Sequence, residues 1–222
     1  AYVVRETMDK MEEMLHILKS VEGCAIVYVR SRARCKSVAT WLEEHGVSAT
    51  FYHAGLEPST KDERQRLWQA DEKRVMAATN AFGMGIDKPD VRLVIHIDCP
   101  DSIEAYFQEA GRAGRDGKKA YAILLWNSGD QAKLTRRIST TFPPKEFVRD
   151  VYDHLACFFE LGVGSGGGHT FTFDIDKFCF IYGYYPLRVA SALHILQNAG
   201  YINYETDPDA QARVKFLVGR DE

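Results

Sequence analysis

The sequence predicts an α/β fold in which a parallel sheet carries helices on both faces, followed by a smaller, mainly helical module. Short apolar runs such as CAIVYV, RVMAAT and VRLVIHID alternate with segments of helical periodicity. Strands that are apolar along their whole length belong in a parallel sheet that is buried on both faces. The length of 222 residues allows one large domain or two smaller ones, and the pattern changes after Trp126.

The N-terminal part of the chain is predicted to run helix, strand, helix. The first helix spans RETMDKMEEMLHILK, because its apolar residues recur at helical spacing. These residues are Met8, Met11, Met14, Leu15 and Leu18. CAIVYV follows as a buried strand. Ser31 then stands where it can cap a helix over SRARCKSVATWLEEHG, whose end is marked by Gly46.

The same alternation continues as far as Trp126. VSATFYH, RVMAAT, VRLVIHID and AYAILLW are predicted strands. STKDERQRLWQA and SIEAYFQEAGR are predicted helices, the first with a capping box from Thr60 to Glu63. Because parallel sheets bind ligands at the carboxyl ends of their strands, a site is expected at the loops after Val29, Tyr52 and Thr79.

The chain is predicted to contain two domains. STTFPPKE carries two prolines that interrupt the helical segment before it, and GVGSGGGH is a glycine-rich loop. The remainder is expected to form helix, turn, helix and a two-stranded wing, with Val189, Leu193 and Leu196 on one face of the second helix. Residues 1–139 are therefore assigned to the α/β domain and residues 140–222 to a helical, winged-helix-like accessory module.

Composition limits the classes of function. A net charge of −3 and a pI of about 6.2 mean that nucleic acid would have to bind at local patches rather than to a generally basic surface. There is no signal pattern and no apolar run long enough to span a bilayer. The five cysteines are scattered without a C-x-x-C pair, which argues against a disulfide framework and a zinc site. We expect a reduced, cytoplasmic protein, nucleoid-associated in a bacterium, with no membrane partner and no metal site.

The segment QEAGRAGRDG concentrates arginines and glycines between apolar runs. If the helix that begins near Ser102 continues through it, Gln108, Arg112 and Arg115 share one face at i, i+4 and i+7. Each glycine inside a helix costs about 1 kcal/mol relative to alanine, and arginine suits planar, multidentate binding of phosphate oxygens. The pattern therefore indicates a phosphate site, with a solvated charged face as the alternative.

Upstream, ATNAFGMGIDKPDV places Gly83, Gly85 and Asp87 just past a buried strand. Such a loop brings backbone amides and a carboxylate to the ligand edge of the sheet. The alternative is a tight turn between strands, which DKPD alone would support. Two further alternatives stay open. His53 could be a polar residue at a strand end whose hydrogen bonds are satisfied, and Thr79 could be an ordinary strand residue.

Taken together, these stretches resemble the second motor lobe of superfamily 2 helicases, most closely the RecQ family. IVYVRSR resembles motif IV, and YHAGL resembles the short motif that follows it. ATNAFGMGIDKPDVRLVIH resembles motif V, and YFQEAGRAGRDG resembles motif VI with its RecQ-type ending. The resemblance covers residues 20 to 126 in the right order and implies a RecA-like sheet.

The resemblance also implies roles for matching positions. Arg112 and Arg115 would reach the γ-phosphate of ATP, with Arg115 as the arginine finger, and Gln108 would couple the nucleotide cleft to the nucleic acid. Gly85 and Asp87 would face the nucleotide and its ribose. The residues implied to line a track for the single-stranded backbone are Ser31, Arg32, His53, Gly55 and Thr79.

Other parts of the helicase machinery are absent from the sequence. No G-x-x-x-x-G-K-[ST] occurs, and no D-E-x-H carboxylate pair stands ready for Mg²⁺. We expect those parts in an N-terminal RecA-like lobe of the same polypeptide, and expect this chain alone not to hydrolyse ATP. RecQ proteins usually follow the motor with four zinc-binding cysteines, whereas only Cys157 and Cys179 lie in that region here.

The sequence therefore predicts the C-terminal part of an ATP-dependent DNA helicase that uses ATP with Mg²⁺ and acts on single-stranded and duplex DNA. Two alternatives stay open: an RNA helicase of the same superfamily, and a non-catalytic nucleic-acid-binding protein that retains a motor lobe. A dinucleotide-binding enzyme is excluded because YVRSRARC stands where G-x-G-x-x-G would follow the first strand.

Overall fold

The computed structural model describes residues 1–83, 87–206 and 212–218. The chain divides into two compact units, residues 1–131 and residues 132–222. This division falls inside helix α5 (Ser128–Thr141), as does the domain boundary that the sequence predicts between residues 139 and 140.

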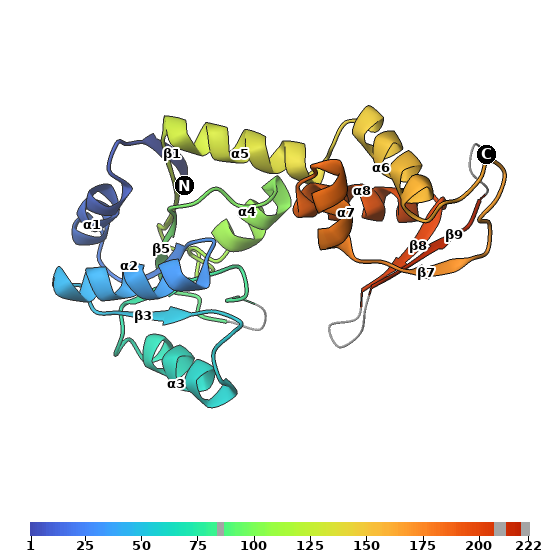
Figure 1. Ribbon diagram of the computed structural model, residues 1–222. Helices are drawn as coiled ribbons and strands as arrows, with labels where there is room; N and C mark the ends of the chain where they lie inside the picture. The colour runs from blue at the N-terminus through green and yellow to red at the C-terminus, as the bar shows by residue number, and fades with distance from the viewer. Residues whose placement is uncertain (84–86, 207–211, 219–222) are drawn as a thin grey trace. The chain divides into compact units, whose positions relative to one another are not determined.

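The first unit is built on a six-stranded sheet whose strand pairs are all parallel (Figure 1). The strand order is β1-β6-β5-β2-β4-β3. The strands are β1 (Tyr2–Glu6), β2 (Cys24–Tyr28), β3 (Ala49–Tyr52), β4 (Val75–Ala78), β5 (Val91–His96) and β6 (Tyr121–Trp126). The predicted parallel α/β fold is thereby confirmed.

Helices cover both faces of this sheet because successive strand residues point to opposite sides. On β2, Ala25 and Val27 pack with α1 (Lys10–Ser20) and α2 (Arg32–Glu44). Ile26 and Tyr28 pack on the other side, with Trp68 of α3 (Pro58–Gln69) and Ala110 of α4 (Ile103–Ala110).

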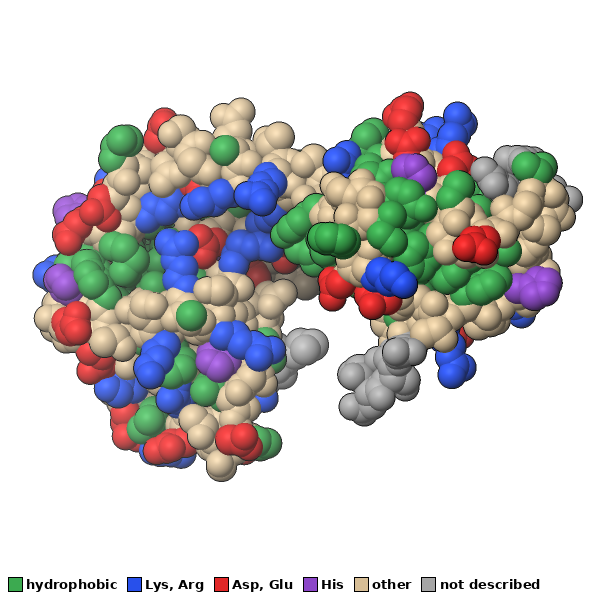
Figure 2. Space-filling view, in the orientation of Figure 1, with side chains coloured by type: hydrophobic (Ala, Val, Ile, Leu, Met, Phe, Trp, Pro, Cys, Tyr) green, Lys and Arg blue, Asp and Glu red, His purple; other side chains and the backbone are tan. Residues whose placement is uncertain are grey.

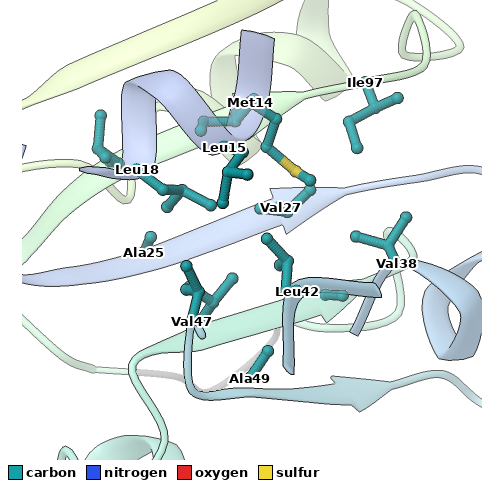
Figure 3. Packing of buried hydrophobic residues seen from close by; sticks show 14 of the residues in the cluster. Met14, Leu15, Leu18, Ala25, Val27, Val38, Leu42, Val47, Ala49 and Ile97 are labelled. Atoms are coloured by element: carbon teal, nitrogen blue, oxygen red, sulfur yellow. The ribbon is translucent and has the colours of Figure 1, made fainter. Parts of the chain in front are cut away.

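Figure 3 shows the first of these two layers, in which side chains of α1, β2 and α2 meet. In this view, Met14 and Leu15 of α1 lie above Val27, and Leu42 of α2 lies below it. All four side chains belong to the same cluster on one face of the sheet. Met14, Leu18, Val27 and Leu42 have no exposed surface. The run CAIVY is apolar throughout because both of its faces are covered in this way.

The N-terminus differs from the sequence prediction. The first helix begins at Lys10 rather than near Arg5, and the residues before it form β1, which pairs with β6 at the edge of the sheet. Asp9 sets the start of the helix, because its side chain accepts hydrogen bonds from the backbone amides of Met11 and Glu12. The β-branched Val3 and Val4 favour a strand over a helix.

The predicted capping box of the third helix is also wrong. Helix α3 begins at Pro58, and Glu57 precedes it without a side-chain capping bond. Proline is favoured in the first turn of a helix because its missing N–H has no partner to lose there.

The second unit has the element order of a winged helix. Its elements after α5 are α6 (Lys145–Phe158), β7 (Thr170–Thr172), α7 (Ile175–Tyr182), α8 (Pro186–Asn198), β8 (Ile202–Glu205) and β9 (Arg213–Phe216). The three strands form an antiparallel sheet in the order β7-β9-β8. The predicted wing pair is present as β8 and β9, whereas β7 is a strand that the sequence analysis missed.

The core of the second unit combines aliphatic side chains with several aromatic rings. Val189, Leu193 and Leu196 of α8 are buried in it, as their spacing predicts. Around them pack the rings of Tyr152, Phe173, Phe178, Tyr204 and Phe216. No helix in the described part of the chain combines the length and apolar character needed to cross a membrane.

Candidate active site

The carboxyl ends of three neighbouring strands lie level with one another. Tyr28 at the end of β2 is in register with Ala78 at the end of β4 and with His96 at the end of β5. The loops that follow these strands therefore start at one edge of the sheet, as predicted for a parallel α/β fold.

The glycine–arginine segment is not the continuous helix that the sequence analysis supposed. Helix α4 ends at Ala110, and Arg112 and Arg115 lie in the turns that follow. Gly114 has a φ of +67°, which a helix does not allow, and a Cβ atom there would lie 2.8 Å from Cβ of Ala120. The two guanidinium groups are thus carried by glycine turns rather than by one helical face.

Arg112 is held against the backbone of the loop that follows β4. Its Nη1 donates to the carbonyl oxygen of Gly83 at 2.7 Å. Gly83 has a φ of +147°, and a Cβ atom there would lie 2.1 Å from Nη2 of Arg112. Only glycine leaves room for this guanidinium. The bond to Gly83 holds the guanidinium group of Arg112 in place. Its Nε is buried and has no hydrogen-bond partner among the described residues, so one of its five N–H donors is unused.

A buried polar network lies beside Arg112. The hydroxyl of Tyr28 donates to the carbonyl oxygen of Phe82 at 3.1 Å, one residue before Gly83. The Tyr28 ring stacks on His96 with 5.3 Å between centroids, and Nε2 of His96 lies 2.9 Å from Oε2 of Glu109. Burial raises the pKa of the Tyr28 hydroxyl far above its ordinary range, although the positive charge of Arg112 acts in the opposite direction.

The sequence analysis did not assign Tyr28, His96 or Glu109 to the site. A signal was present, because a histidine at the end of the apolar run VRLVIH needs a partner when it is buried. Its partner, Glu109, lies within the glycine–arginine motif itself.

Arg115 is more open than Arg112. Its side chain is 42% exposed, and its Nη1 lies 3.9 Å from Oδ1 of Asp87, whose side chain is 88% exposed. The structure thus brings together the arginine and the aspartate that were predicted to face a nucleotide. Gln108 is exposed on the last turn of α4. Gly85, the other residue predicted to face the nucleotide, lies outside the described residues.

The predicted track residues lie at the ends of β2, β3 and β4. Ser31 caps α2, where its hydroxyl accepts from the amide of Arg34 at 3.2 Å. The guanidinium of Arg32 lies against Gly55, where a Cβ atom would be 2.7 Å from Nη1. Thr79 is 8% exposed, and its carbonyl accepts from the amide of Phe82. The structure therefore groups Arg32 with Gly55 and gives Thr79 a structural contact in its loop.

Ion pairs fix the loop after β2 to the loop after β5. The guanidinium of Arg30 pairs with Asp101, and its backbone amide donates to Asp98 at 3.1 Å. Nη1 of Arg34 lies 2.6 Å from the other carboxylate oxygen of Asp98. In the described part of the chain, no group of three or more His, Cys, Asp or Glu residues is arranged to hold a metal ion.

The family model for the helicase conserved C-terminal domain matches residues 6–117. The chain belongs to this family. The match contains both arginines, Gly83 and the predicted track residues, and its relatives identify the chain as RecQ-like.

The RecQ-like DNA helicase blm-1 of Caenorhabditis elegans is 46% identical over 134 residues, which are 60% of this chain and 13% of the relative. The ATP-dependent DNA helicase RecQ of Pasteurella multocida is 45% identical over 134 residues, 60% of this chain and 21% of the relative. The chain thus spans a small part of these curated helicases. Among solved structures, a DEAD box protein of Methanococcus jannaschii is 30% identical with a TM-score of 0.53, over 63% of this chain and 38% of that one.

Proposed function

We propose that this chain is the second motor lobe and accessory module of an ATP-dependent DNA helicase of RecQ type. Such an enzyme would couple ATP hydrolysis to movement along single-stranded DNA and to separation of a duplex. The observation that carries the proposal is the pair of arginines, with Arg112 locked on Gly83 and Arg115 beside Asp87.

In this proposal the arginines meet the phosphates of a nucleotide held mainly by a preceding lobe. The fit rests on the chemistry of the two side chains, since a planar guanidinium fork matches phosphate oxygens and the side chain of Arg115 is 42% exposed. Arg115, the more exposed of the two, stabilises charge that builds up during phosphoryl transfer. Asp87, which lies beside it, would face the ribose. The ligands of Mg²⁺ belong to the preceding lobe, and the 222-residue chain alone does not hydrolyse ATP.

Single-stranded DNA would cross the ends of β2, β3 and β4. The contacts proposed here are to phosphates, which hold a strand without reading its sequence. The residues assigned to this track are Ser31, Arg32, His53, Gly55 and Thr79. Gln108, exposed on the last turn of α4, would couple the track to the nucleotide. DNA is preferred over RNA as the substrate because the curated relatives carry the name of DNA helicase.

The test is Arg115→Ala in the full-length protein, measured as DNA-stimulated ATP turnover. Loss of an arginine finger is expected to lower kcat by roughly 10³-fold or more, while binding of single-stranded DNA stays nearly unchanged. Arg66→Ala is the matched control, because Arg66 is exposed and pairs with Glu72 at the surface. Unchanged turnover in Arg115→Ala would refute the assignment.

A further inference from the structure

A group of basic side chains surrounds the end of β3 and the first turns of α3. Arg32 comes from the start of α2, His53 follows β3, and Lys61 and Arg64 come from α3. We refer to these four residues as the β3–α3 basic cluster. Figure 2 shows Lys and Arg side chains gathered around a histidine on the surface over these elements. Lys61 and Arg64 lie outside the track residues assigned above.

Two members of the cluster, Arg64 and His53, are held by packing on Phe51. The guanidinium of Arg64 lies 3.6 Å from the centroid of the Phe51 ring, and its Nη1 donates to the Phe51 carbonyl oxygen at 3.1 Å. The imidazole of His53 stacks against the same ring, with centroids 5.8 Å apart and an interplanar angle of 28°. These contacts hold the positively charged guanidinium of Arg64 and the titratable imidazole of His53 on the same aromatic ring.

The charge of the cluster is not balanced by carboxylates. In the part of the chain that the structure describes, no carboxylate forms an ion pair with Arg32, Lys61 or Arg64. Glu63 acts electrostatically on Arg64 without forming an ion pair with it. Three cations that converge without an ion-paired acid favour the arrival of an anion.

His53 sits at the centre of this field. Burial, followed by the charges of Arg32, Arg64 and Lys61, holds the pKa of its imidazole below its usual range. Its Nδ1 is buried and has no hydrogen-bond partner among the described residues. Both burial and the surrounding cations therefore disfavour the protonated imidazole in the free protein.

We propose that the β3–α3 basic cluster binds one backbone phosphate of a single-stranded nucleic acid and that His53 takes up a proton as the phosphate binds. A phosphate carries negative charge into the cluster and offsets the repulsion that disfavours protonation of His53. Arg32, Lys61 and Arg64 neutralise the phosphate, and the protonated imidazole adds a charge-assisted hydrogen bond. The proposal rests on the proposed function, because it extends the same track from the sheet loops onto α3.

The sign of the pH dependence follows from this linkage. The bound phosphate raises the pKa of His53 relative to the free protein, so the complex holds more protons than the separate partners between the two pKa values. Affinity therefore increases as pH falls through that window. For one linked proton the increase cannot exceed about tenfold per pH unit.

The first experiment measures the dependence of affinity on salt. The 222-residue chain is titrated into a short fluorescein-labelled oligothymidylate, and binding is followed by fluorescence anisotropy. Lys61→Gln is expected to lower the slope of log K against log salt by about 0.7, the value for one phosphate contact on a single strand. Lys19→Gln makes the same charge change on an exposed residue of α1 and is expected to leave the slope unaltered.

The second experiment tests the proton. Between about pH 7.5 and about pH 6, wild-type affinity is expected to rise roughly threefold to tenfold through His53. His53→Gln should flatten this rise, whereas His16→Gln, a change at an exposed histidine of α1, should keep it. The imidazole NMR signal of His53 should also titrate at a higher pH in the complex. Inorganic phosphate at the same concentration is expected to produce a much smaller shift.

The two experiments test the basic cluster, the identity of the bound anion and the nucleic-acid track separately. Equal salt slopes for Lys61→Gln and Lys19→Gln, or equal pH profiles for His53→Gln and wild type, would overturn the cluster while leaving the nucleic-acid track intact. A shift of the His53 signal by inorganic phosphate as large as that by the oligothymidylate would overturn the nucleic acid as occupant. No binding of the oligothymidylate to the wild-type chain would overturn the proposed track itself.

Discussion

In the first unit, the cluster between the parallel sheet and helices α1 and α2 buries aliphatic side chains and, among the described residues, no aromatic ring. The core of the second unit instead mixes aliphatic side chains with aromatic rings between three helices and a three-stranded sheet. A strand buried on both faces needs compact side chains, so β2 and β5 are rich in Ala, Val, Ile and Leu. The second unit has fewer elements to bury, and each aromatic ring removes more apolar area from water. The smaller unit thus draws more of its buried apolar area from aromatic rings than the α1–α2 layer of the first unit does.

The two units also differ in how they use buried polar groups. In the first unit, His96 bonds to Glu109 at the carboxyl edge of the sheet. Tyr28 and Arg112 bond there to the successive carbonyl oxygens of Phe82 and Gly83. In the second unit, His154 bonds to the hydroxyl of Tyr184 and stacks on a further ring at the side of the core. The polar groups of the first unit therefore shape the loops of the candidate active site, whereas the bond between His154 and Tyr184 joins α6 to the turn between α7 and α8.

The largest effect is expected from the core of the second unit. Phe178 has no exposed surface, and Phe178→Ala should lower the free energy of unfolding by about 3–5 kcal/mol. Hydrogen exchange read by mass spectrometry should show lost protection over α6, α8 and β9, with the first unit unchanged. Leu93→Ala is the reciprocal change in the aliphatic core, expected to cost about 2–5 kcal/mol and to deprotect β2 and β5. Loss of protection across both units from either change would contradict two separate cores.

A somewhat smaller effect is expected at Gly83, whose carbonyl oxygen accepts a hydrogen bond from Arg112. In Gly83→Ala the new methyl group would meet the guanidinium at 2.1 Å, so Arg112 must move. ATP turnover of the full-length protein should fall by roughly 10²–10³-fold, as when one preorganised donor is lost. Gly46→Ala serves as the control, since Gly46 also has a positive φ but a Cβ atom there has no neighbour within 4 Å. Equal ATP turnover in the two variants would contradict the assignment of Arg112 to the candidate active site.

The smallest effect is expected from single hydroxyl groups. Tyr184→Phe removes the 2.7 Å bond to Nδ1 of His154 and should lower the free energy of unfolding by about 0.5–1.5 kcal/mol, measured by urea denaturation. Tyr28→Phe removes the bond to Phe82 in the first unit and should cost about 1–3 kcal/mol, because it leaves a buried carbonyl without its partner. If Tyr184→Phe lowered the free energy of unfolding more than Tyr28→Phe, the buried polar groups of the first unit would not be the more important ones for stability.

Local patterns in the sequence were sufficient for the main elements of both units. Apolar runs gave the inner strands, Ser31 gave the start of α2, and the spacing of Val189, Leu193 and Leu196 gave the buried face of α8. These features depend on residues close together in the chain. The edge strand β1 was missed because its pairing with β6 joins residues more than a hundred positions apart.

The residue types of the candidate site were also determined by the sequence. The motifs named Arg112, Arg115 and Asp87, and the structure brings Arg115 and Asp87 together. The glycines of QEAGRAGRDG, however, were placed inside a helix, where they instead end α4 and turn the chain. A glycine can permit either conformation, and only its surroundings select one.

The amino-acid sequence by itself determined a parallel α/β lobe of the helicase C-terminal family, a smaller module after it, and the motifs in their order. Only the tertiary structure decided that Arg112 lies on Gly83, that His96 pairs with Glu109, and that α3 adds two cations to the end of β3. Periodicity reports which face of an element is buried, because that depends on near neighbours. Contacts between side chains of different elements depend on strand order and loop path, which no local pattern specifies.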